Sequence, residues 1–339
     1  MIHRSTGAVE AIYPAPNDWK QILRNSRMST QELLAAVGLA SHPLASAEAE
    51  KLFELRVPKP YLERIKHGDP NDPLLLQVMP QTREFDSPAQ FGPDPLDEKS
   101  YSPVRGIIHK YRNRVLLIAT QTCTINCRYC FRRHFPYNEH RQSREEWQEA
   151  LAYIEQHPEI DEVILSGGDP MVLDNNYLGW LIDAIAAIPQ VARIRIHSRL
   201  LAALPQRIDD GFLHILTQSI KPIVVVLHCN HANEIDDLLH EKLKQLRATG
   251  AHVLNQSVLL KGVNDNADTL ANLSRRLFDV GVMPYYLFLL DKVSGASHFE
   301  VSAARAKAIH QELAAMVSGF LLPKLMVEIP GHPSKTFLR

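Results

Sequence analysis

The chain has few cysteines, almost no net charge and no long apolar run, and each shortage excludes a class of protein. Four cysteines in 339 residues are too few for a disulfide scaffold, and they fit a reducing, cytoplasmic compartment better. The formal net charge of −1 provides no general attraction to nucleic acid or to anionic lipid. No apolar run approaches the ~20 residues of a membrane-spanning helix, and residues 1–19 lack the apolar segment of a signal peptide.

The composition is typical of a globular protein, since 45% of the residues are hydrophobic and 22% are charged. A chain of this length forms one large or two ordinary domains and buries a core without disulfides. Short amphipathic segments at residues 29–40 and 61–68 predict helices, and Pro- and Asp-rich stretches follow them. We therefore expect an N-terminal helical and irregular wrapping region over residues 1–100.

From Arg114 onward, apolar β-branched runs alternate with amphipathic segments. The runs predict strands at residues 114–120, 162–166, 193–198, 222–228, 252–260 and 284–290. The amphipathic segments predict helices at residues 143–157, 175–188, 234–250 and 267–281, the first beginning with a capping box and the last two ending in glycine. This alternation implies βαβ units with a parallel sheet in a central domain, residues 101–320. Periodicity leaves two α/β folds open, namely a full or partial barrel and an open doubly wound sheet.

Three of the four cysteines are clustered directly after the first predicted strand, as Cys123, Cys127 and Cys130. Three thiolates on one short loop can bind three irons of a [4Fe–4S] cluster and leave the fourth iron open to a small molecule. A structural zinc normally takes four closed ligands in two separated pairs, which this stretch lacks. An open zinc site completed by His134 and a set of merely buried thiols are the alternatives. We do not assign Cys229 as a ligand.

The cysteine pattern resembles that of the radical S-adenosylmethionine (radical SAM) superfamily, in which the open iron binds S-adenosylmethionine. The resemblance implies an α/β fold with a partial (β/α)6-type barrel, and chemistry at the C-terminal ends of its strands. Tyr129, before the third cysteine, matches an aromatic residue that is usual in that family. A Gly-rich turn after the second strand matches the segment that meets the methionine end of the cofactor, here Ser166, Gly167, Gly168 and Asp169.

Motifs from about residue 50 to the end of the chain together resemble those of the lysine 2,3-aminomutases: "IIHKYRNRVLLIAT", "CRYCFRRHF", "ILSGGDP", "HCNHANEI", "NQSVLLKGVNDN", "PYYLFLLD" and "SGASHF". The resemblance implies conversion of L-lysine to β-lysine by a 5′-deoxyadenosyl radical and pyridoxal 5′-phosphate. It is closest to the short aminomutase that makes β-lysine for modifying elongation factor P, because the chain stops soon after its last motif. That similarity implies a functional link to elongation factor P and its lysyl ligase, and a low-potential electron donor of flavodoxin or ferredoxin type.

The resemblance also assigns roles to individual residues. Lys335, in a C-terminal segment at residues 321–339, matches the lysine that holds pyridoxal phosphate as a Schiff base. Arg132 matches the arginine that pairs with the substrate carboxylate, and Asp291 a carboxylate that holds the ε-ammonium group. Glu328 stands where catabolic family members have an aspartate. Its extra methylene group shifts the carboxylate by about one C–C bond, and we expect this shift to weaken or reposition binding of the ε-ammonium group. Further cofactor contacts are expected at Tyr111, Arg114, His228, Gln256 and Ser257.

Two other functions remain open at this point. One is a radical SAM enzyme that lacks pyridoxal phosphate and acts on a peptide or nucleic acid. The other is a non-catalytic iron–sulfur sensor, which would need a DNA-binding segment or basic face that the sequence does not display. The sequence also leaves homo-oligomerisation open.

Overall fold

The computed structural model describes residues 18–123, 125–136 and 143–338. The expectation that the chain begins without a signal peptide concerns mainly residues 1–17, which lie outside the described residues. Within the described residues, no helix is long and apolar enough to cross a membrane.

One nine-stranded sheet runs through the described residues, and its strands follow each other in sequence order from β1 to β9. The strands from β2 to β8 are parallel, whereas β1 and β9 are antiparallel at the two edges. Because the order never reverses, the sheet is not doubly wound, and because β1 does not pair with β9, the barrel is open. The α/β partial-barrel prediction is therefore confirmed. The strands are β1 Ile107–Tyr111, β2 Arg114–Thr120, β3 Glu162–Gly167, β4 Arg193–Ser198, β5 Ile223–Leu227, β6 His252–Val258, β7 Met283–Phe288, β8 Lys324–Val327 and β9 Thr336–Phe337.

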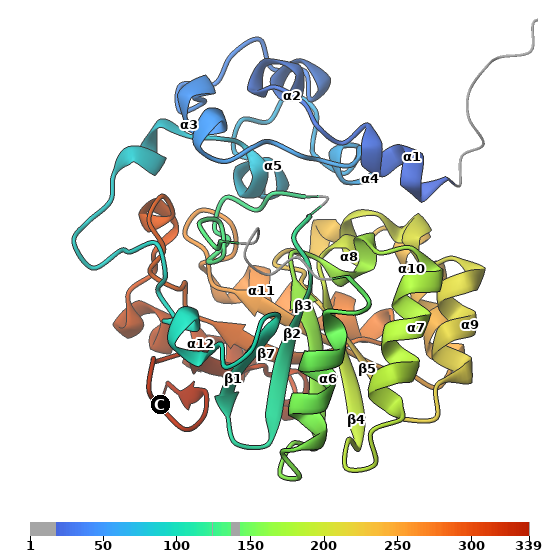
Figure 1. The fold of residues 1–339 in the computed structure, drawn as a ribbon. Helices are drawn as coiled ribbons and strands as arrows, with labels where there is room; N and C mark the ends of the chain where they lie inside the picture. Colours follow the sequence, from blue (N-terminus) through green and yellow to red (C-terminus); the bar gives the residue numbers. More distant parts are fainter. Residues whose placement is uncertain (1–17, 124, 137–142, 339) are drawn as a thin grey trace, which may run out of the picture.

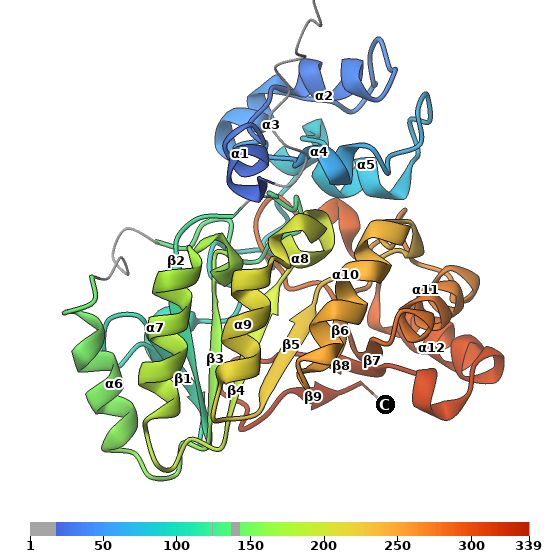
Figure 2. The same cartoon turned by 90° about the vertical axis from the view of Figure 1, so that its right-hand side faces the viewer.

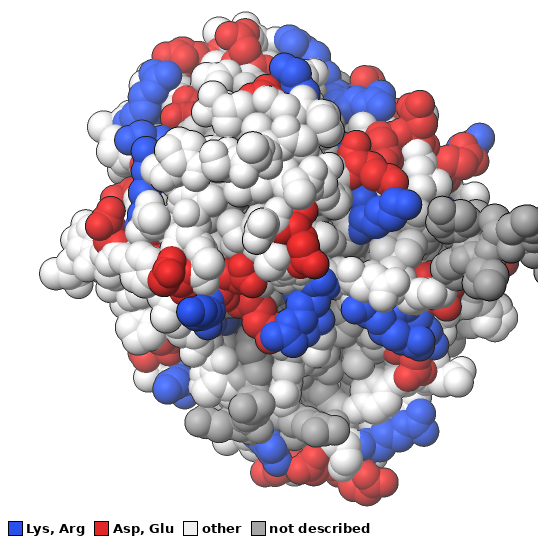
Figure 3. Space-filling view, turned by 90° about the horizontal axis from the view of Figure 1, so that it is seen from above, with Lys and Arg blue, Asp and Glu red and all other residues white. Residues whose placement is uncertain are grey.

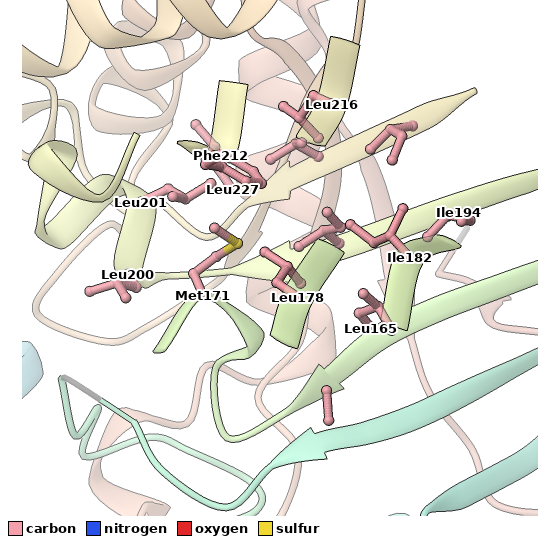
Figure 4. Packing of buried hydrophobic residues seen from close by; sticks show 14 of the residues in the cluster. Leu165, Met171, Leu178, Ile182, Ile194, Leu200, Leu201, Phe212, Leu216 and Leu227 are labelled. Atoms are coloured by element: carbon pink, nitrogen blue, oxygen red, sulfur yellow. The ribbon is translucent and has the colours of Figure 1, made fainter. Parts of the chain in front are cut away.

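Helices follow the parallel strands and cover the outer face of the sheet (Figures 1 and 2). Their apolar residues pack on the outward-facing residues of β3, β4 and β5, as Figure 4 shows for Leu178 and Ile182 against Leu165 and Ile194. This buried layer leaves the inner face of the sheet available for polar residues. The helices are α6 Trp147–Glu155, α7 Asn175–Ala186, α8 Leu200–Ala203, α9 Asp210–Gln218, α10 Asp237–Ala248, α11 Ala267–Asp279 and α12 Ala303–Met316.

Short helices of the N-terminal region lie over the C-terminal ends of the parallel strands (Figures 1 and 2). They form a separate apolar cluster that includes Leu33, Tyr61 and Leu74. Fully buried Arg128 ties the region to the barrel, because its guanidinium donates to the Glu84 carboxylate and to the carbonyl of Phe53. The helices are α1 Trp19–Arg24, α2 Thr30–Ala36, α3 Ala47–Leu52, α4 Lys59–Leu62 and α5 Pro73–Val78.

The predicted strands and most of the predicted helices are confirmed with shifts at their ends, but the helix predicted at residues 61–68 is wrong, because only residues 61 and 62 are helical, at the end of α4. Before α6, the Ser143 amide donates to the Glu146 carboxylate and the Glu146 amide donates to the Ser143 hydroxyl, as expected for a capping box. The glycines after α10 and α11 have φ of 88° at Gly250 and 74° at Gly281, the left-handed conformation that favours glycine. From residue 101 onward, the sequence patterns did not predict β1, α8, α9, α12 and β9.

Candidate active site

A cavity of about 250 Å³ lies inside the barrel, beneath the N-terminal region. Its lining combines the cysteine loop, the inner face of the sheet and the ends of β7 and β8. Every site residue expected from the sequence lines it except Ser257. These residues are Tyr111, Arg114, Cys123, Cys127, Tyr129, Cys130, Arg132, Ser166, Gly167, Gly168, Asp169, His228, Gln256, Asp291, Glu328 and Lys335.

Cys123, Cys127 and Cys130 form one end of this cavity, which we call the cysteine end. Their loop is attached to the N-terminal region, because the Asn126 amide donates to the Arg56 carbonyl and the Arg128 amide donates to the Gln77 carbonyl. All three thiols are free. Burial raises their pKa values, to about 11 for Cys130, so the thiols are neutral at neutral pH.

The glycine turn after β3 packs directly against the backbone of the cysteine loop. A Cβ atom on Gly168 would lie 2.4 Å from the Thr122 carbonyl oxygen, and one on Gly167 would lie 2.6 Å from that of Thr120. Gly167 also has a φ of 111°. Only glycine fits both positions, so the turn fixes the cysteine loop by close backbone contact.

Asp169 is fully engaged in holding strand ends together. Its carboxylate accepts hydrogen bonds from the Ser198 hydroxyl and from the amides of Arg199 and Leu200, each at 2.8–2.9 Å. A further bond comes from the Met171 amide. These contacts join the β3 turn to the end of β4, and they favour a positioning role for Asp169 beside its predicted cofactor contact.

The opposite end of the cavity, which we call the lysine end, contains Lys110, Asp291, Glu328 and Lys335. The Glu328 carboxylate bridges two cations, with Lys335 Nζ at 2.7 Å and Lys110 Nζ at 2.8 Å. Burial opposes ionisation of Glu328, but the charges of Lys335 and Lys110 outweigh burial and lower its pKa to about 2. Glu328 is therefore ionised at neutral pH and orients the amine of Lys335 over the Phe288 ring, 4.5 Å from its centroid.

Asp291 differs from Glu328 although it lies at the same end. Its carboxylate has no hydrogen-bond or ion-pair partner within the described parts of the chain. Burial, followed by the negative charge of Glu328, raises its pKa to about 7. An ammonium group entering the cavity would therefore meet a carboxyl group that no side chain of the described residues already pairs with, and its positive charge would favour the ionised form of that group.

Arg132 also lines the cavity and is already held by the protein. Its guanidinium makes two hydrogen bonds to Glu98, at 2.8 and 2.7 Å, and one to the Ser166 hydroxyl at 3.1 Å. A guanidinium fixed in this way presents a constant orientation toward the cavity.

The remaining predicted contacts are distributed along the walls. The Arg114 guanidinium stacks over the Tyr111 ring at 4.4 Å. Tyr129 accepts a hydrogen bond from the Asn230 amide, and His228 Nε2 lies 3.3 Å from His197 Nδ1. Gln256 lines the cavity from β6.

Three residues considered from the sequence lie away from the cavity lining. The Ser257 hydroxyl donates to the Cys229 carbonyl, and both residues are buried behind the cavity wall. Cys229 has no place in the lining, in agreement with its exclusion from the ligand set. His134 Nε2 contacts the Ser294 carbonyl at 3.1 Å on the surface, which argues against a zinc site that includes it.

Sequence reasoning missed several residues that line the cavity. Glu98 comes from the N-terminal region, Lys110 from β1, and Arg195 and His197 from β4. The alternation of β4, "RIRIHS", contained a usable signal, because polar residues at every second position of a barrel strand point to its inner face. No such signal marked Lys110, whose partner Glu328 lies 218 residues away in sequence.

The donor set of the cavity fits an iron–sulfur cluster at one end and an aldehyde cofactor at the other. Within the described residues, no three His, Cys, Asp or Glu side chains converge on a single metal ion. A [4Fe–4S] cluster does not require convergence, because each thiolate binds a different iron. Lys335 offers the primary amine that an imine with an aldehyde requires, and its hydrogen bond to the Glu328 carboxylate fixes the position of that amine.

Comparison with known proteins agrees with this site. The model of the Radical SAM superfamily matches residues 117–273, from β2 into α11. L-lysine 2,3-aminomutase of Escherichia coli is 49% identical over 95% of both chains, and that of Haemophilus influenzae is 48% identical over 96% of this chain and 97% of the other. L-lysine 2,3-aminomutase of Clostridium subterminale is 34% identical over 94% of this chain and 77% of that one.

The fold and the cavity define a radical SAM enzyme with a partial barrel. More specifically, the chain belongs to the L-lysine 2,3-aminomutase family. Members of this family are isomerases that use a [4Fe–4S] cluster, S-adenosylmethionine and pyridoxal phosphate.

Proposed function

We propose that this protein is an L-lysine 2,3-aminomutase that converts L-lysine to β-lysine. The observation that carries the proposal is the single cavity that has three free thiols at one end and a lysine paired with a carboxylate at the other. This arrangement places a radical generated at the cysteine end and an amino acid held at the lysine end within one cavity.

Cys123, Cys127 and Cys130 hold the [4Fe–4S] cluster, with the glycine turn fixing their loop. Lys335 holds pyridoxal phosphate, and Tyr111, Arg114, Tyr129, His228 and Gln256 contribute to the walls around the cofactors. When bound, the cluster and S-adenosylmethionine supply radical hydrogen abstraction, and pyridoxal phosphate supplies a π system that delocalises an unpaired electron.

The substrate is oriented by charges at both of its ends. Arg132, fixed by Glu98, pairs with the carboxylate of L-lysine. Asp291 pairs with the ε-ammonium group, which the unneutralised carboxylate favours. Glu328 contributes less to lysine binding than Asp291, because Lys110 and Lys335 already occupy its two oxygens.

The cellular setting follows from the chemistry and from the family. An oxygen-sensitive cluster and a low-potential electron donor of flavodoxin or ferredoxin type fit the cytoplasm. We assign β-lysine to the modification of elongation factor P by its lysyl ligase.

Within the chain, we assign residues 1–100 to the wrapping region, residues 101–320 to the barrel and residues 321–339 to the segment that contains Lys335. Figure 3 shows acidic and basic residues interspersed on the face above the barrel, which does not favour a nucleic-acid substrate.

An anaerobic assay tests this function. The reconstituted protein is incubated with L-lysine, S-adenosylmethionine, dithionite and pyridoxal phosphate, and the amino acids are separated by chromatography. We expect β-lysine only when all components are present. Cleavage of S-adenosylmethionine without any β-lysine would favour a radical SAM enzyme with another substrate, and an intact cluster without cleavage would favour a sensor.

A further inference from the structure

Residues 91–98, "FGPDPLDE", lie between the N-terminal helices and β1, and we call them the linker segment. Within the linker segment, only Glu98 takes part in the proposed function. The segment forms no helix or strand before Glu98, but it is stiffer than an ordinary loop, because the rings of Pro93 and Pro95 fix the backbone angle φ at two of its positions.

The C-terminal end of the linker segment fixes Arg132. The buried Glu98 carboxylate accepts hydrogen bonds from Arg132 Nε and Nη2, at 2.8 and 2.7 Å. Two bonds between a planar guanidinium and a carboxylate hold both groups in one relative orientation. The position of the Arg132 guanidinium therefore depends on the position of Glu98.

The backbone around Glu98 is itself held in place. The Asp94 carboxylate accepts hydrogen bonds from the amides of Glu98, at 3.0 Å, and of Lys99, at 3.4 Å. Asp97 has a φ of 51° and is the only residue other than glycine with a positive φ in the described parts of the chain. A backbone in an uncommon conformation needs such support, and it is found most often near functional sites.

The N-terminal end of the linker segment fixes the chain on both sides of Asp291. The Gly92 amide donates to the Lys292 carbonyl at 2.9 Å, directly after Asp291. The buried Phe91 side chain belongs to the same apolar cluster as Leu290, directly before Asp291. The linker segment therefore holds the strand end that carries the proposed ε-ammonium partner.

The middle of the linker segment contacts the lysine end of the cavity. The Leu96 carbonyl accepts a hydrogen bond from Lys110 Nζ at 3.0 Å, and Lys110 also pairs with Glu328. Leu96 and Glu98 both line the cavity. One stiff piece of chain thus touches the supports of both charged groups that orient the substrate.

We propose that the linker segment determines selectivity for L-lysine by fixing the spacing between Arg132 and Asp291, an inference that rests on the proposed function. In that function the two residues bind opposite ends of the substrate, so their spacing selects the length of the carbon chain between carboxylate and ammonium group. L-ornithine has the same charged groups on a chain one methylene shorter. A fixed spacing favours lysine over ornithine, and a loosened linker segment lets the spacing adapt to the shorter chain.

The test loosens the linker segment without changing a residue that lines the cavity. Asp94→Ala removes the carboxylate that accepts from the Glu98 amide, whereas Asp94→Asn retains an acceptor oxygen. A second loosened variant, Pro93→Gly combined with Pro95→Gly, changes no charge. Asp174→Ala is the matched control, because Asp174 caps α7 through the same kind of bond outside the cavity lining.

Binding is measured on protein that contains the cluster and pyridoxal phosphate. Equilibrium dialysis gives the Kd values of L-lysine and L-ornithine without S-adenosylmethionine, so that no turnover occurs, and iron and pyridoxal phosphate are counted in the same preparation. Formation of β-lysine by the parent protein is assayed separately. The quantity compared among the variants is the ratio of the two Kd values.

We expect the parent to bind L-lysine about tenfold or more tightly than L-ornithine, as one methylene can provide. Loss of one capping bond changes an equilibrium by about fivefold, so the ratio should fall by about that factor in Asp94→Ala and in the double proline variant, through weaker binding of lysine. Asp94→Asn and Asp174→Ala should retain the parent ratio, and cofactor content should not change in any variant.

A parent ratio near one, or a ratio that both loosened variants retain, would overturn the proposal. Equal losses for the two amino acids, or loss of iron or pyridoxal phosphate in both loosened variants, would overturn it in favour of a general structural role. If the parent binds neither amino acid and forms no β-lysine, the proposed function itself fails, and this inference fails with it.

Discussion

The cysteine end of the cavity comes from one short loop, whereas the lysine end takes its four side chains from segments far apart in the sequence. Cys123, Cys127 and Cys130 are neighbours in the chain, but Lys110 precedes β2 and Lys335 precedes β9. The first end is therefore defined by local spacing and the second by the topology of the whole sheet. Spacing alone indicated the first site, whereas Asp291, Glu328 and Lys335 of the second were assigned only through the resemblance to the lysine 2,3-aminomutases.

The two ends also differ in charge. At the cysteine end, burial raises the pKa of each thiol and keeps it neutral. At the lysine end, Glu328 is paired with two lysines, whereas the Asp291 carboxylate has no hydrogen-bond or ion-pair partner among the described residues. Substitutions at the two ends should consequently have separable effects on the two cofactors.

Replacement of any of the three clustered cysteines by alanine should have the largest effect, because both the cluster and all downstream chemistry are lost. Iron and sulfide per chain, counted after anaerobic reconstitution, should fall strongly in Cys123→Ala, Cys127→Ala and Cys130→Ala. Cys229→Ala, which removes a buried thiol outside the cavity, is the control and should retain the cluster. The ligand assignment is wrong if Cys229→Ala loses the cluster while one of the three keeps it.

Lys335→Ala should abolish formation of β-lysine but leave the cysteine end intact. The variant should contain the parent amount of iron, and slow cleavage of S-adenosylmethionine should distinguish it from a cysteine variant. Lys324→Ala is the matched control, since Lys324 is an exposed lysine of β8 outside the cavity lining. Conversion of L-lysine by Lys335→Ala at the parent rate would contradict the assignment of the lysine end.

Asp291→Asn should raise the KM for L-lysine by roughly ten- to a hundredfold, because the ε-ammonium group loses its charged partner in a buried place. Iron content and bound pyridoxal phosphate should not change. Asp237→Asn, at a fully exposed side chain, controls for the loss of one negative charge. Near-normal lysine kinetics in Asp291→Asn would remove this residue from the substrate site.

The KM for L-lysine should also depend on pH through Asp291. Its pKa of about 7 means that the carboxyl is neutral below that pH and ionised above it. Because only the ionised form pairs with an ammonium group, KM should fall as the pH rises from about 6 to about 8 and then level off. The Asp291→Asn variant should have a flat profile over this range, and a profile identical to that of the parent would assign the titration to another group.

Lys110→Met should have the smallest effect of the series. It removes one of the two cations on Glu328 and leaves the other, so the carboxylate remains ionised but is less firmly fixed. We expect turnover to fall by a few-fold, with Lys110→Arg restoring most of it. A loss as large as that of Lys335→Ala would mean that Lys110 has a direct role in the chemistry.

The sequence was sufficient for the parallel strands β2 to β7, because each is rich in apolar β-branched or aromatic residues and has a clear boundary. The predicted strands "RVLLIAT" and "RIRIHS" match β2 and β4 at both ends. It was not sufficient for β1, a short edge strand that pairs antiparallel with β2 and contributes Lys110. Lys110 lies in β1 and Glu328 directly follows β8, so the two residues come close only because the sheet curves into a partial barrel. No local sequence pattern can therefore predict their contact.

Mapping the bound cofactor decides which lysine holds it, because Lys335 and Lys110 both contact Glu328 and both carry an amine that reacts with aldehydes. The protein is loaded with pyridoxal phosphate, reduced with borohydride, digested and analysed by mass spectrometry, with iron counted in the same preparation. We predict a pyridoxyl group on Lys335 in protein that retains its iron–sulfur cluster. A pyridoxyl group on Lys110, Lys292 or Lys324, or its absence from the chain, would contradict the account.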